Sequence, residues 1–339
     1  MKTVLVTGGA GYIGSHACKA LRAAGHTPVT FDNLDTGWRD AVRYGPFEEG
    51  DLQDRARLEA VFARHKPTAV MHFAALSDIA AATCDPGRTW RVNVTGSLNL
   101  IETAVAAGCQ SFILSSTCAV YGNHTGDTLT EATPRAPLNA YGASKRAIED
   151  MLSDFEVSHA LRSVIFRYFN VAGADPEGEI GERHEPETHL IPLALQAIDG
   201  MRPALTVNGT DYATPDGTCI RDYVHVCDLA RAHVQGLDWL DSGRDSRVFN
   251  LGSGRGFSVR EVLSAAEQVT GQPVPLTYGP RRAGDCTRLV ASPARAHDEL
   301  GWRPERSDLE TMIGDAWAWH QQCRARQDQA PNPARPTAT

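Results

Sequence analysis

The sequence predicts an α/β fold: a doubly wound parallel sheet with a second, smaller α/β domain. Two observations carry this prediction. Short apolar, β-branched runs alternate with helical stretches, and a glycine-rich turn follows the first of these runs directly. Alternating strands and helices are typical of a parallel sheet with both faces covered. The length of 339 residues is enough for about two domains.

The first βαβ unit is the clearest part of the pattern. Residues 2–7 (KTVLVT) predict a strand, and the helical stretch that starts at Ile13 stops at Gly25. A second apolar run over 27–31 ends at Asp32, which completes a unit of about 30 residues. This unit predicts a sheet of the Rossmann type.

Further along the chain the alternation continues and then changes character. Strand-like runs at 68–74 and 111–116 are separated by a helical stretch at 93–108, whereas glycine, proline and acidic residues cluster after about residue 170. We therefore expect the Rossmann domain over 1–169 with a return segment near 222–250, the second domain mainly over 170–324, and a disordered, proline-rich tail over 325–339.

Composition excludes several classes of protein. Lys and Arg number 33 against 41 Asp and Glu, a formal charge of −8, so no global positive field favours nucleic acid or anionic lipid. The opening MKTVLVTGGAG is too short an apolar stretch for a signal peptide or membrane span. The eight cysteines form no CxxC pair or other zinc grouping, so we expect no bound metal. Because they are scattered along the chain, we expect their thiols to be reduced and the protein to be cytoplasmic.

The turn after the first strand predicts a dinucleotide site. Gly8, Gly11 and Gly14 allow the backbone to approach a pyrophosphate at a helix N-terminus. Such turns also arise from tight strand–helix packing, but here a strand precedes, a helix follows, and Asp32 stands 24 residues after Gly8. A carboxylate at that place accepts the ribose hydroxyls and repels a 2′-phosphate, which favours NAD over NADP. The alternative is that Asp32 is a turn or capping residue beside Asn33.

Two further groups carry candidate chemistry. Tyr141 and Lys145 are four residues apart on a predicted helix, so the ammonium can favour the phenolate of a tyrosine that is otherwise a weak base. Ser115 and Thr117 stand at the end of the fourth main strand, where ligands bind in open α/β sheets. The alternatives are an exposed helix start with an incidental lysine and a strand end whose hydroxyls bond their own turn.

Together these patterns resemble the extended short-chain dehydrogenase/reductase family over about residues 1–320. The resemblance is strongest to its members that act on nucleotide sugars. It rests on TGGAGYIGSH, GDL (50–52), HFAAL (72–76), SSTCAVYG, YGASK, RYFNVAGA (167–174), DGTCIRDYVHVCDLARAH (216–233) and PRRAGD (280–285).

The resemblance implies a role for each matching residue. Tyr141, Lys145 and Thr117 would be catalytic. NAD would be contacted by Gly8, Gly11, Tyr12, Ile13, Gly14, Asp32, Asn33, Asp51, Leu52, Phe73, Ala74, Ala75, Asn93, Ser115, Tyr141, Lys145 and Phe169. The UDP-sugar would be held by Thr117, Asn170, His189, Leu190, Arg221, Tyr223, Val259, Arg282, Asp285 and Leu289.

The chain departs from the family pattern at two places. Ser77 stands where some members have a lysine that reaches the cofactor phosphates, which implies weaker retention of NAD. His189 replaces the asparagine of an Asn-Leu pair, and we expect it to donate to the substrate diphosphate. A metalloprotease helix is excluded in HEPETHLIP, because its histidines are five apart with Pro186 between them.

The activity that the resemblance implies is interconversion of UDP-glucose and UDP-galactose at C4 through a transient 4-keto sugar. Because members of the family are commonly homodimers, the resemblance also implies a homodimer. A UDP-xylose or UDP-N-acetylhexosamine substrate is an alternative, since Leu289 is smaller than the tyrosine of some members. A 4,6-dehydratase or decarboxylase would need an acid or base just after Thr117, where Cys118 and Ala119 stand. A catalytically silent nucleotide-binding protein is the remaining alternative.

Overall fold

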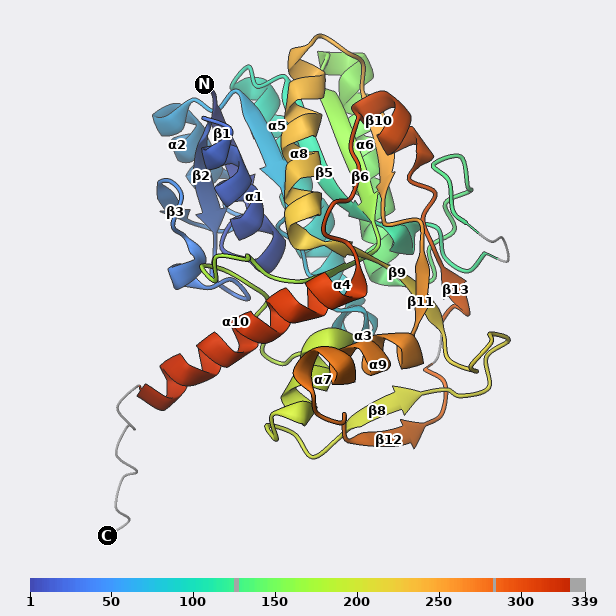
Figure 1. The fold of residues 1–339 in the computed structure, drawn as a ribbon. Coiled ribbons are helices and arrows are strands. Elements are labelled where there is room, and N and C mark those ends of the chain that lie inside the picture. The colour runs from blue at the N-terminus through green and yellow to red at the C-terminus, as the bar shows by residue number, and fades with distance from the viewer. Residues whose placement is uncertain (125–127, 283–284, 330–339) are drawn as a thin grey trace.

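The structure is a computed structural model that describes residues 1–124, 128–282 and 285–329. Its largest unit is a seven-stranded sheet in the order β10-β6-β5-β4-β1-β2-β3, in which all neighbours are parallel (Figure 1). The strands are β1 (Thr3–Thr7), β2 (Thr27–Asp32), β3 (Phe47–Glu49), β4 (Ala69–His72), β5 (Ser111–Thr117), β6 (Arg162–Tyr168) and β10 (Arg247–Leu251).

Helices cover both faces of this sheet because the strands are apolar on both sides. Val4 and Val6 of β1 pack in one core with Leu229, whereas Leu5 packs in the opposite core with Leu58 and Leu100. The first core lies under α1 (Tyr12–Ala23) and α8 (Val226–Asp241). The second lies under α2 (Arg55–His65), α5 (Gly96–Ala106) and α6 (Ala140–His159). The predicted doubly wound α/β fold is confirmed.

A smaller α/β unit is built from two further sheets and three helices (Figure 1). Its strands are β7 (Asn170–Ala172), β9 (Ile220–His225), β11 (Gly256–Ser258) and β13 (Arg288–Leu289) in one sheet, with β8 (Leu205–Asn208) and β12 (Leu276–Gly279) in the other. Its helices are α7 (Leu190–Ile198), α9 (Val259–Thr270) and α10 (Leu309–Gln329). Leu195, Val262 and Met312 join these helices in a separate core.

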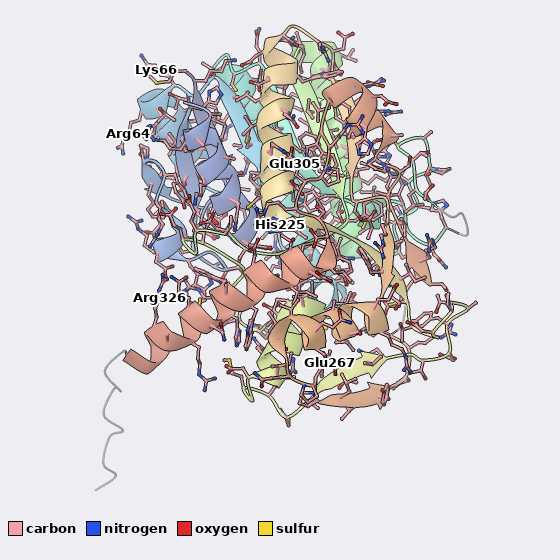
Figure 2. All side chains as sticks on the ribbon, viewed as in Figure 1. Arg64, Lys66, His225, Glu267, Glu305 and Arg326 are labelled. Carbon is pink, nitrogen blue, oxygen red and sulfur yellow. The ribbon has the colours of Figure 1, made fainter. Side chains whose placement is uncertain are left out.

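The remaining elements are short. They are η1 (Arg39–Ala41), α3 (Ile79–Cys84), α4 (Pro86–Thr89), η2 (Trp90–Thr95), η3 (Cys118–Val120) and η4 (Ala296–Leu300). His225, labelled in Figure 2, lies where β9 passes into α8, and its Nε2 lies 3.0 Å from Asp315 Oδ2 of α10. This contact fixes α10 against the junction between the units.

The chain crosses between the units more often than the predicted boundaries imply. α8 and β10 belong to the large sheet, as expected for the return segment, but β9 pairs with the smaller sheet. Trp302, inside the range assigned to the second domain, is fully buried in the core under α1 and α8, and its indole N–H donates to the Asp228 carbonyl at 2.8 Å. The domain boundaries themselves remain a prediction.

The predicted disordered tail over 325–339 is wrong for its first part. α10 continues to Gln329. The buried side chains of Met312, Ile313 and Trp319 anchor the helix, and each further residue then adds one hydrogen bond to a helix that already exists. Residues 330–339 lie outside the described residues. Within the described part of the chain, no helix combines the length and apolar character needed to cross a membrane.

Candidate active site

The glycine turn stands between β1 and α1, and its geometry admits only glycine at two positions. Gly8 has φ of +71°, and a Cβ there would lie 2.5 Å from the Ala74 nitrogen. A Cβ on Gly14 would lie 2.1 Å from the Gly8 carbonyl oxygen. Gly11 is the N-cap of α1 and provides no side-chain cap, so the first turn of α1 presents its N–H groups to an anion. The turn therefore fits a pyrophosphate.

Asp32 ends β2 beside this turn. Its two carboxylate oxygens accept hydrogen bonds from the main-chain N–H groups of Ala10 at 3.0 Å and Leu34 at 2.9 Å. Burial raises the pKa of Asp32, and these two hydrogen bonds act in the opposite direction. Asn33 donates to Asp51 Oδ2 at 2.9 Å, so two more predicted cofactor residues lie together at the carboxyl edge of the sheet. Asp32 thus acts as a turn residue in this structure, with its carboxylate still beside the glycine turn.

The segment after β4 lies against the same turn. The N–H groups of Phe73 and Ala74 donate to the Thr7 carbonyl at 2.9 and 3.1 Å. The Asn93 side chain accepts from Leu76 N–H at 2.8 Å and donates to the Leu76 carbonyl at 3.0 Å, so it holds this segment in place. The other predicted cofactor residues nearby are Ile13, packed in the core under α1; Leu52, buried against Gly96; and half-buried Ala75. Ser77, which replaces the family lysine, is exposed.

The predicted catalytic residues meet where β5 ends and α6 begins. Asn139 caps α6 by accepting from Gly142 N–H at 2.8 Å, which places Tyr141 and Lys145 on the buried side of the first turns. Lys145 Nζ donates to the Ser115 carbonyl at 2.8 Å. Thr117, two residues further along β5, hydrogen-bonds to Tyr141. The structure therefore brings all four residues into one constellation.

Burial dominates the electrostatics of this constellation. It raises the pKa of the Tyr141 phenol, and the nearby Tyr168 raises it further, while the hydrogen bond to Thr117 lowers it. It lowers the pKa of Lys145 to about 8, against an opposing contribution from Glu149. Lys145, whose ammonium bonds the strand carbonyl, is not among the groups that set the Tyr141 pKa in this structure. A cationic nicotinamide ring would add the missing positive charge.

Two side chains near the constellation, half-buried Tyr168 and buried Glu149, were missed by the sequence reasoning. Tyr168 places its hydroxyl 2.6 Å from Ser115 Oγ, and burial raises its pKa to about 12. Glu149, one helical turn after Lys145, accepts from Ser116 Oγ at 2.6 Å and from Arg167 Nη2 at 2.6 Å. The i, i+4 spacing of Lys145 and Glu149 and the tyrosine of RYFN were the available signals.

The predicted substrate residues gather on the smaller sheet. Arg221 of β9 donates to the Cys286 carbonyl at 2.8 Å and pairs with Asp285 at 3.4 Å. Leu289 of β13 is in register with Arg221 and packs in one cluster with Phe169, beside Cys118. Apolar contacts thereby link the neighbour of Arg221 on β13 to the residue after Thr117 at the end of β5.

The remaining substrate residues lie around this sheet. Asn170 donates to the Asp222 carbonyl at 3.2 Å, and Tyr223 is buried beside it in register. Val259 begins α9. Arg282 is exposed, and its guanidinium lies 3.0 Å from the Asn208 side chain with the amide oxygen turned toward it. The Arg221 guanidinium is fixed by the main-chain carbonyls of Ile220 and Cys286.

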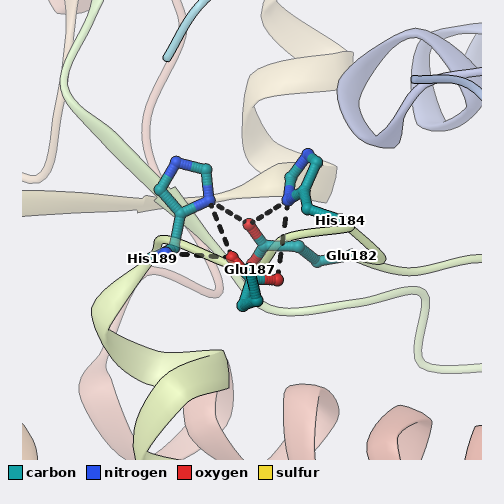
Figure 3. Close-up of side chains that lie close together, drawn as sticks. All are labelled: Glu182, His184, Glu187 and His189. Carbon is teal, nitrogen blue, oxygen red and sulfur yellow. Dashed lines mark hydrogen bonds and ion pairs between the residues drawn. The ribbon is translucent and has the colours of Figure 1, made fainter. Parts of the chain in front are cut away.

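His189 and Leu190 stand at the start of α7, where His189 is the N-cap. The His189 imidazole is engaged by a carboxylate, with Nδ1 2.5 Å from Glu182 Oε1 (Figure 3). His184 lies beside the same carboxylate. Burial lowers the pKa of His184, but hydrogen bonds to Glu182 and Glu187 outweigh it and raise that pKa to about 10. Sequence reasoning assigned roles to His189 and Leu190 but not to Glu182, His184 or Glu187.

A cavity of about 810 Å³ lies elsewhere, at the amino ends of the strands, with Lys2, Lys66, Arg162 and Asp241 in its lining. Ligands of open α/β sheets bind at the opposite, carboxyl edge, where the glycine turn and Tyr141 stand. We therefore assign no role in the reaction to this cavity.

The fold and the constellation define a dinucleotide-dependent enzyme in which a tyrosine, a lysine and a threonine surround one position at the sheet edge. Residues 4–252 match the NAD dependent epimerase/dehydratase family, and the chain belongs to that family. The predicted family and the predicted cofactor NAD are confirmed.

Known proteins resemble nearly the whole chain. A UDP-glucose 4-epimerase of Rhizobium leguminosarum bv. trifolii is 51% identical over 319 residues, 94% of this chain and 97% of that protein. A UDP-glucose 4-epimerase structure from Brucella ovis in complex with NAD has a TM-score of 0.92 and 46% identity, over 94% of this chain and 98% of that one. One from Bifidobacterium longum in complex with NAD⁺ and UDP has a TM-score of 0.90 and 34% identity, over 94% and 98%.

Proposed function

We propose that the chain interconverts UDP-glucose and UDP-galactose by inverting C4 of the sugar through a transient 4-keto sugar. The observation that carries the proposal is the meeting of Tyr141, Thr117 and Lys145 around the end of β5. It stands in a chain that is 51% identical to a UDP-glucose 4-epimerase over 319 residues. The activity is that of an isomerase.

NAD fits the carboxyl edge of the sheet. The N–H groups at the start of α1 would hold its pyrophosphate, and Asp32 would accept from the adenosine ribose. When bound, NAD supplies the acceptor that takes a hydride from C4 and the donor that returns it. The protein must then position the sugar and move one proton.

Tyr141 is the group that moves this proton. As a phenolate it accepts the proton of the C4 hydroxyl, and as a phenol it returns a proton to the C4 oxygen when the hydride comes back. Thr117 shares a hydrogen bond with Tyr141 and holds the same oxygen. Lys145, anchored on the Ser115 carbonyl, keeps an ammonium beside the pair.

Inversion requires that the diphosphate stays bound while the sugar turns. Arg221 and Arg282 supply the positive charge that a diphosphate needs in a chain of net charge −8. Apolar side chains such as Phe169 and Leu289 face the sugar side without directed hydrogen bonds. The 4-keto sugar can thus present either face for hydride return.

The size of Leu289 favours a second substrate class. Leu289 packs against Phe169 and Ala291 beside the end of β5, and a leucine leaves more room than a tyrosine. An N-acetyl group at C2 of the sugar, or a pentose, is therefore an additional substrate in this proposal.

A dehydratase is disfavoured by the residue after Thr117. Burial raises the pKa of the Cys118 thiol to about 12, so it stays protonated at neutral pH and can serve as neither base nor acid. Ala119 has no ionisable group.

The proposal includes a homodimer in the cytoplasm. Ile79, Trp90 and Val157 are 48%, 41% and 89% exposed on or beside α3, α4 and α6, which supports a second copy covering this side. All eight cysteines are free, which supports a reducing compartment. The mass in solution, measured by light scattering, tests the dimer.

The activity is tested on the purified chain with UDP-galactose. The expected product is UDP-glucose, with bound cofactor detected by its absorbance and no net consumption of added NAD. A stable 4-keto-6-deoxy sugar would instead identify a dehydratase, and no conversion would support the silent binding protein.

A further inference from the structure

Four metal-binding side chains converge in the segment before α7. Glu182, His184, Glu187 and His189 point toward one another from a short irregular stretch of chain (Figure 3). Each offers one ligand atom, and these atoms lie within 4.8 Å of one another. The sequence suggested no such site, because the residues share neither a helix face nor a known zinc spacing. The loop brings them together instead.

The distances between these atoms match the edges of a tetrahedral metal site. Bonds of roughly 2.0 to 2.2 Å to zinc place tetrahedral ligand atoms about 3.3 to 3.6 Å apart. His184 Nδ1 lies 3.4 Å from Glu182 Oε1 and 3.6 Å from Glu187 Oε2, and His189 Nδ1 lies 3.6 Å from Glu187 Oε1. The 2.5 Å contact of His189 Nδ1 with Glu182 Oε1 is shorter and would lengthen by about 1 Å on metal binding. The two Glu187 oxygens each face one histidine, and one of them would bind the ion.

The charges of the cluster call for a cation. The side chains of Glu182 and Glu187 are only 6% and 5% exposed, and two buried carboxylates this close require positive charge between them. His184 Nδ1 is a buried atom that faces both of them, at ion-pair distances of 3.4 Å from Glu182 Oε1 and 3.6 Å from Glu187 Oε2. A metal ion would displace the proton of this nitrogen and then bind its lone pair.

The ligands are also held from outside the cluster. Glu187 Oε1 accepts from the main-chain N–H groups of Thr188 at 2.8 Å and His189 at 2.9 Å, which fixes its carboxylate. The Tyr12 ring stands edge-on to His184, with centroids 6.5 Å apart, and its hydroxyl donates to the Gly173 carbonyl at 2.6 Å. The cluster therefore lies between the glycine turn and the start of α7.

We propose that Glu182, His184, Glu187 and His189 form a binding site for one divalent transition-metal ion, Zn²⁺ by the chemistry of its ligands. Two imidazoles and two carboxylates suit zinc better than calcium or magnesium, which prefer oxygen alone. The ion has a structural role: it joins the loop over Tyr12 to α7. Binding to the metal would also take His189 away from the diphosphate role that the sequence suggested.

Metal binding is tested directly on the full chain. The protein is stripped with a chelator, dialysed, and titrated with Zn²⁺ against a chromophoric competitor; Co²⁺ is then added in its place. The expected result is one ion per chain, a higher Tm with Zn²⁺, and the visible absorption of four-coordinate Co²⁺ without bands from thiolate ligands. Since turnover is not measured, this result is independent of the proposed function.

Variants separate this site from adventitious binding. His184→Ala and Glu187→Gln should each weaken Zn²⁺ binding by roughly 100-fold or more, whereas His159→Ala, at the exposed end of α6, should not change it. Glu187→Gln keeps the side-chain shape, and retained NAD binding and circular dichroism verify its folding. Absence of stoichiometric binding, or equal affinity in all variants, would overturn the proposal and leave protonated histidines as the counter-charge.

Discussion

Lys145 Nζ of α6 donates a 2.8 Å hydrogen bond to the main-chain carbonyl of Ser115 in β5. A helix side chain is thereby fixed to the strand that carries Thr117 two residues later. The bond sets the distance between α6 and β5 at the point where Tyr141 begins the helix. The positions of the proposed acid–base groups thus depend on one buried ammonium.

Replacing Tyr141 with Phe should remove the proton carrier and keep the ring. We expect turnover of UDP-galactose to fall by about 10²- to 10⁴-fold, the usual contribution of a general acid–base group. NAD binding should be unchanged. Tyr278→Phe, at a tyrosine that is 60% exposed, is the matched control. Turnover within a few-fold of the wild type would contradict the role of Tyr141.

Replacing Lys145 with Met should change how stability depends on pH. The folded protein releases the Lys145 proton near pH 8, whereas the unfolded chain releases it near pH 10.5. Between these two pH values the unfolded state therefore binds more protons than the folded state. The free energy of unfolding rises with pH over this range. The variant lacks this rise. Relative to it, the wild type should gain roughly 3 kcal/mol across that window.

The measurement is urea unfolding of both proteins without bound cofactor, at intervals from pH 7 to 10. Lys66→Met, at an exposed lysine after α2 labelled in Figure 2, serves as the control. A constant difference between the wild type and the Lys145 variant over this range would show that the lysine is not buried as described.

Gly14→Ala should weaken both folding and cofactor binding. The new Cβ would lie 2.1 Å from the Gly8 carbonyl oxygen, a backbone atom that cannot move without opening the turn. We expect a loss of roughly 1–3 kcal/mol in stability and a clear drop in NAD affinity. Gly314→Ala in α10, where nothing lies within 4 Å, should instead stabilise by up to about 1 kcal/mol. Unchanged NAD affinity in Gly14→Ala would contradict the pyrophosphate site.

Asp32→Asn should reduce the preference for NAD over NADP. The amide removes the charge that repels a 2′-phosphate, and it can accept only one of the two main-chain hydrogen bonds that Asp32 now accepts. We expect NAD affinity to fall by more than NADP affinity, measured by cofactor titration. Asp35→Asn, at an exposed aspartate that pairs with Arg88, is the control. An unchanged ratio of the two affinities would exclude Asp32 from ribose recognition.

Leu289→Tyr tests the sugar pocket. A larger ring beside Phe169 should lower turnover of UDP-N-acetylgalactosamine by about 10-fold or more relative to UDP-galactose, because one added group in a packed pocket costs roughly 1–3 kcal/mol. Leu138→Tyr, at a leucine that is 57% exposed, is the control. If the wild type already rejects the N-acetyl sugar, the size argument for Leu289 is wrong.

The sequence determined the fold class, the family and the cofactor. The periodicity of β1 and α1, the three glycines and the position of Asp32 are local features, and local backbone requirements can be read from neighbouring residues. Tyr141 and Lys145 were found in the same way, because one helical turn separates them.

Only the tertiary structure decided which distant residues meet. Tyr168 reaches Ser115 because β6 pairs with β5, and Trp302 returns to the core under α1 from a range assigned to the other domain. His184 and Glu182 meet Glu187 in an irregular loop that has no period to reveal the contact. Strand order and loop path depend on packing across the whole chain, so spacing along the sequence does not contain them.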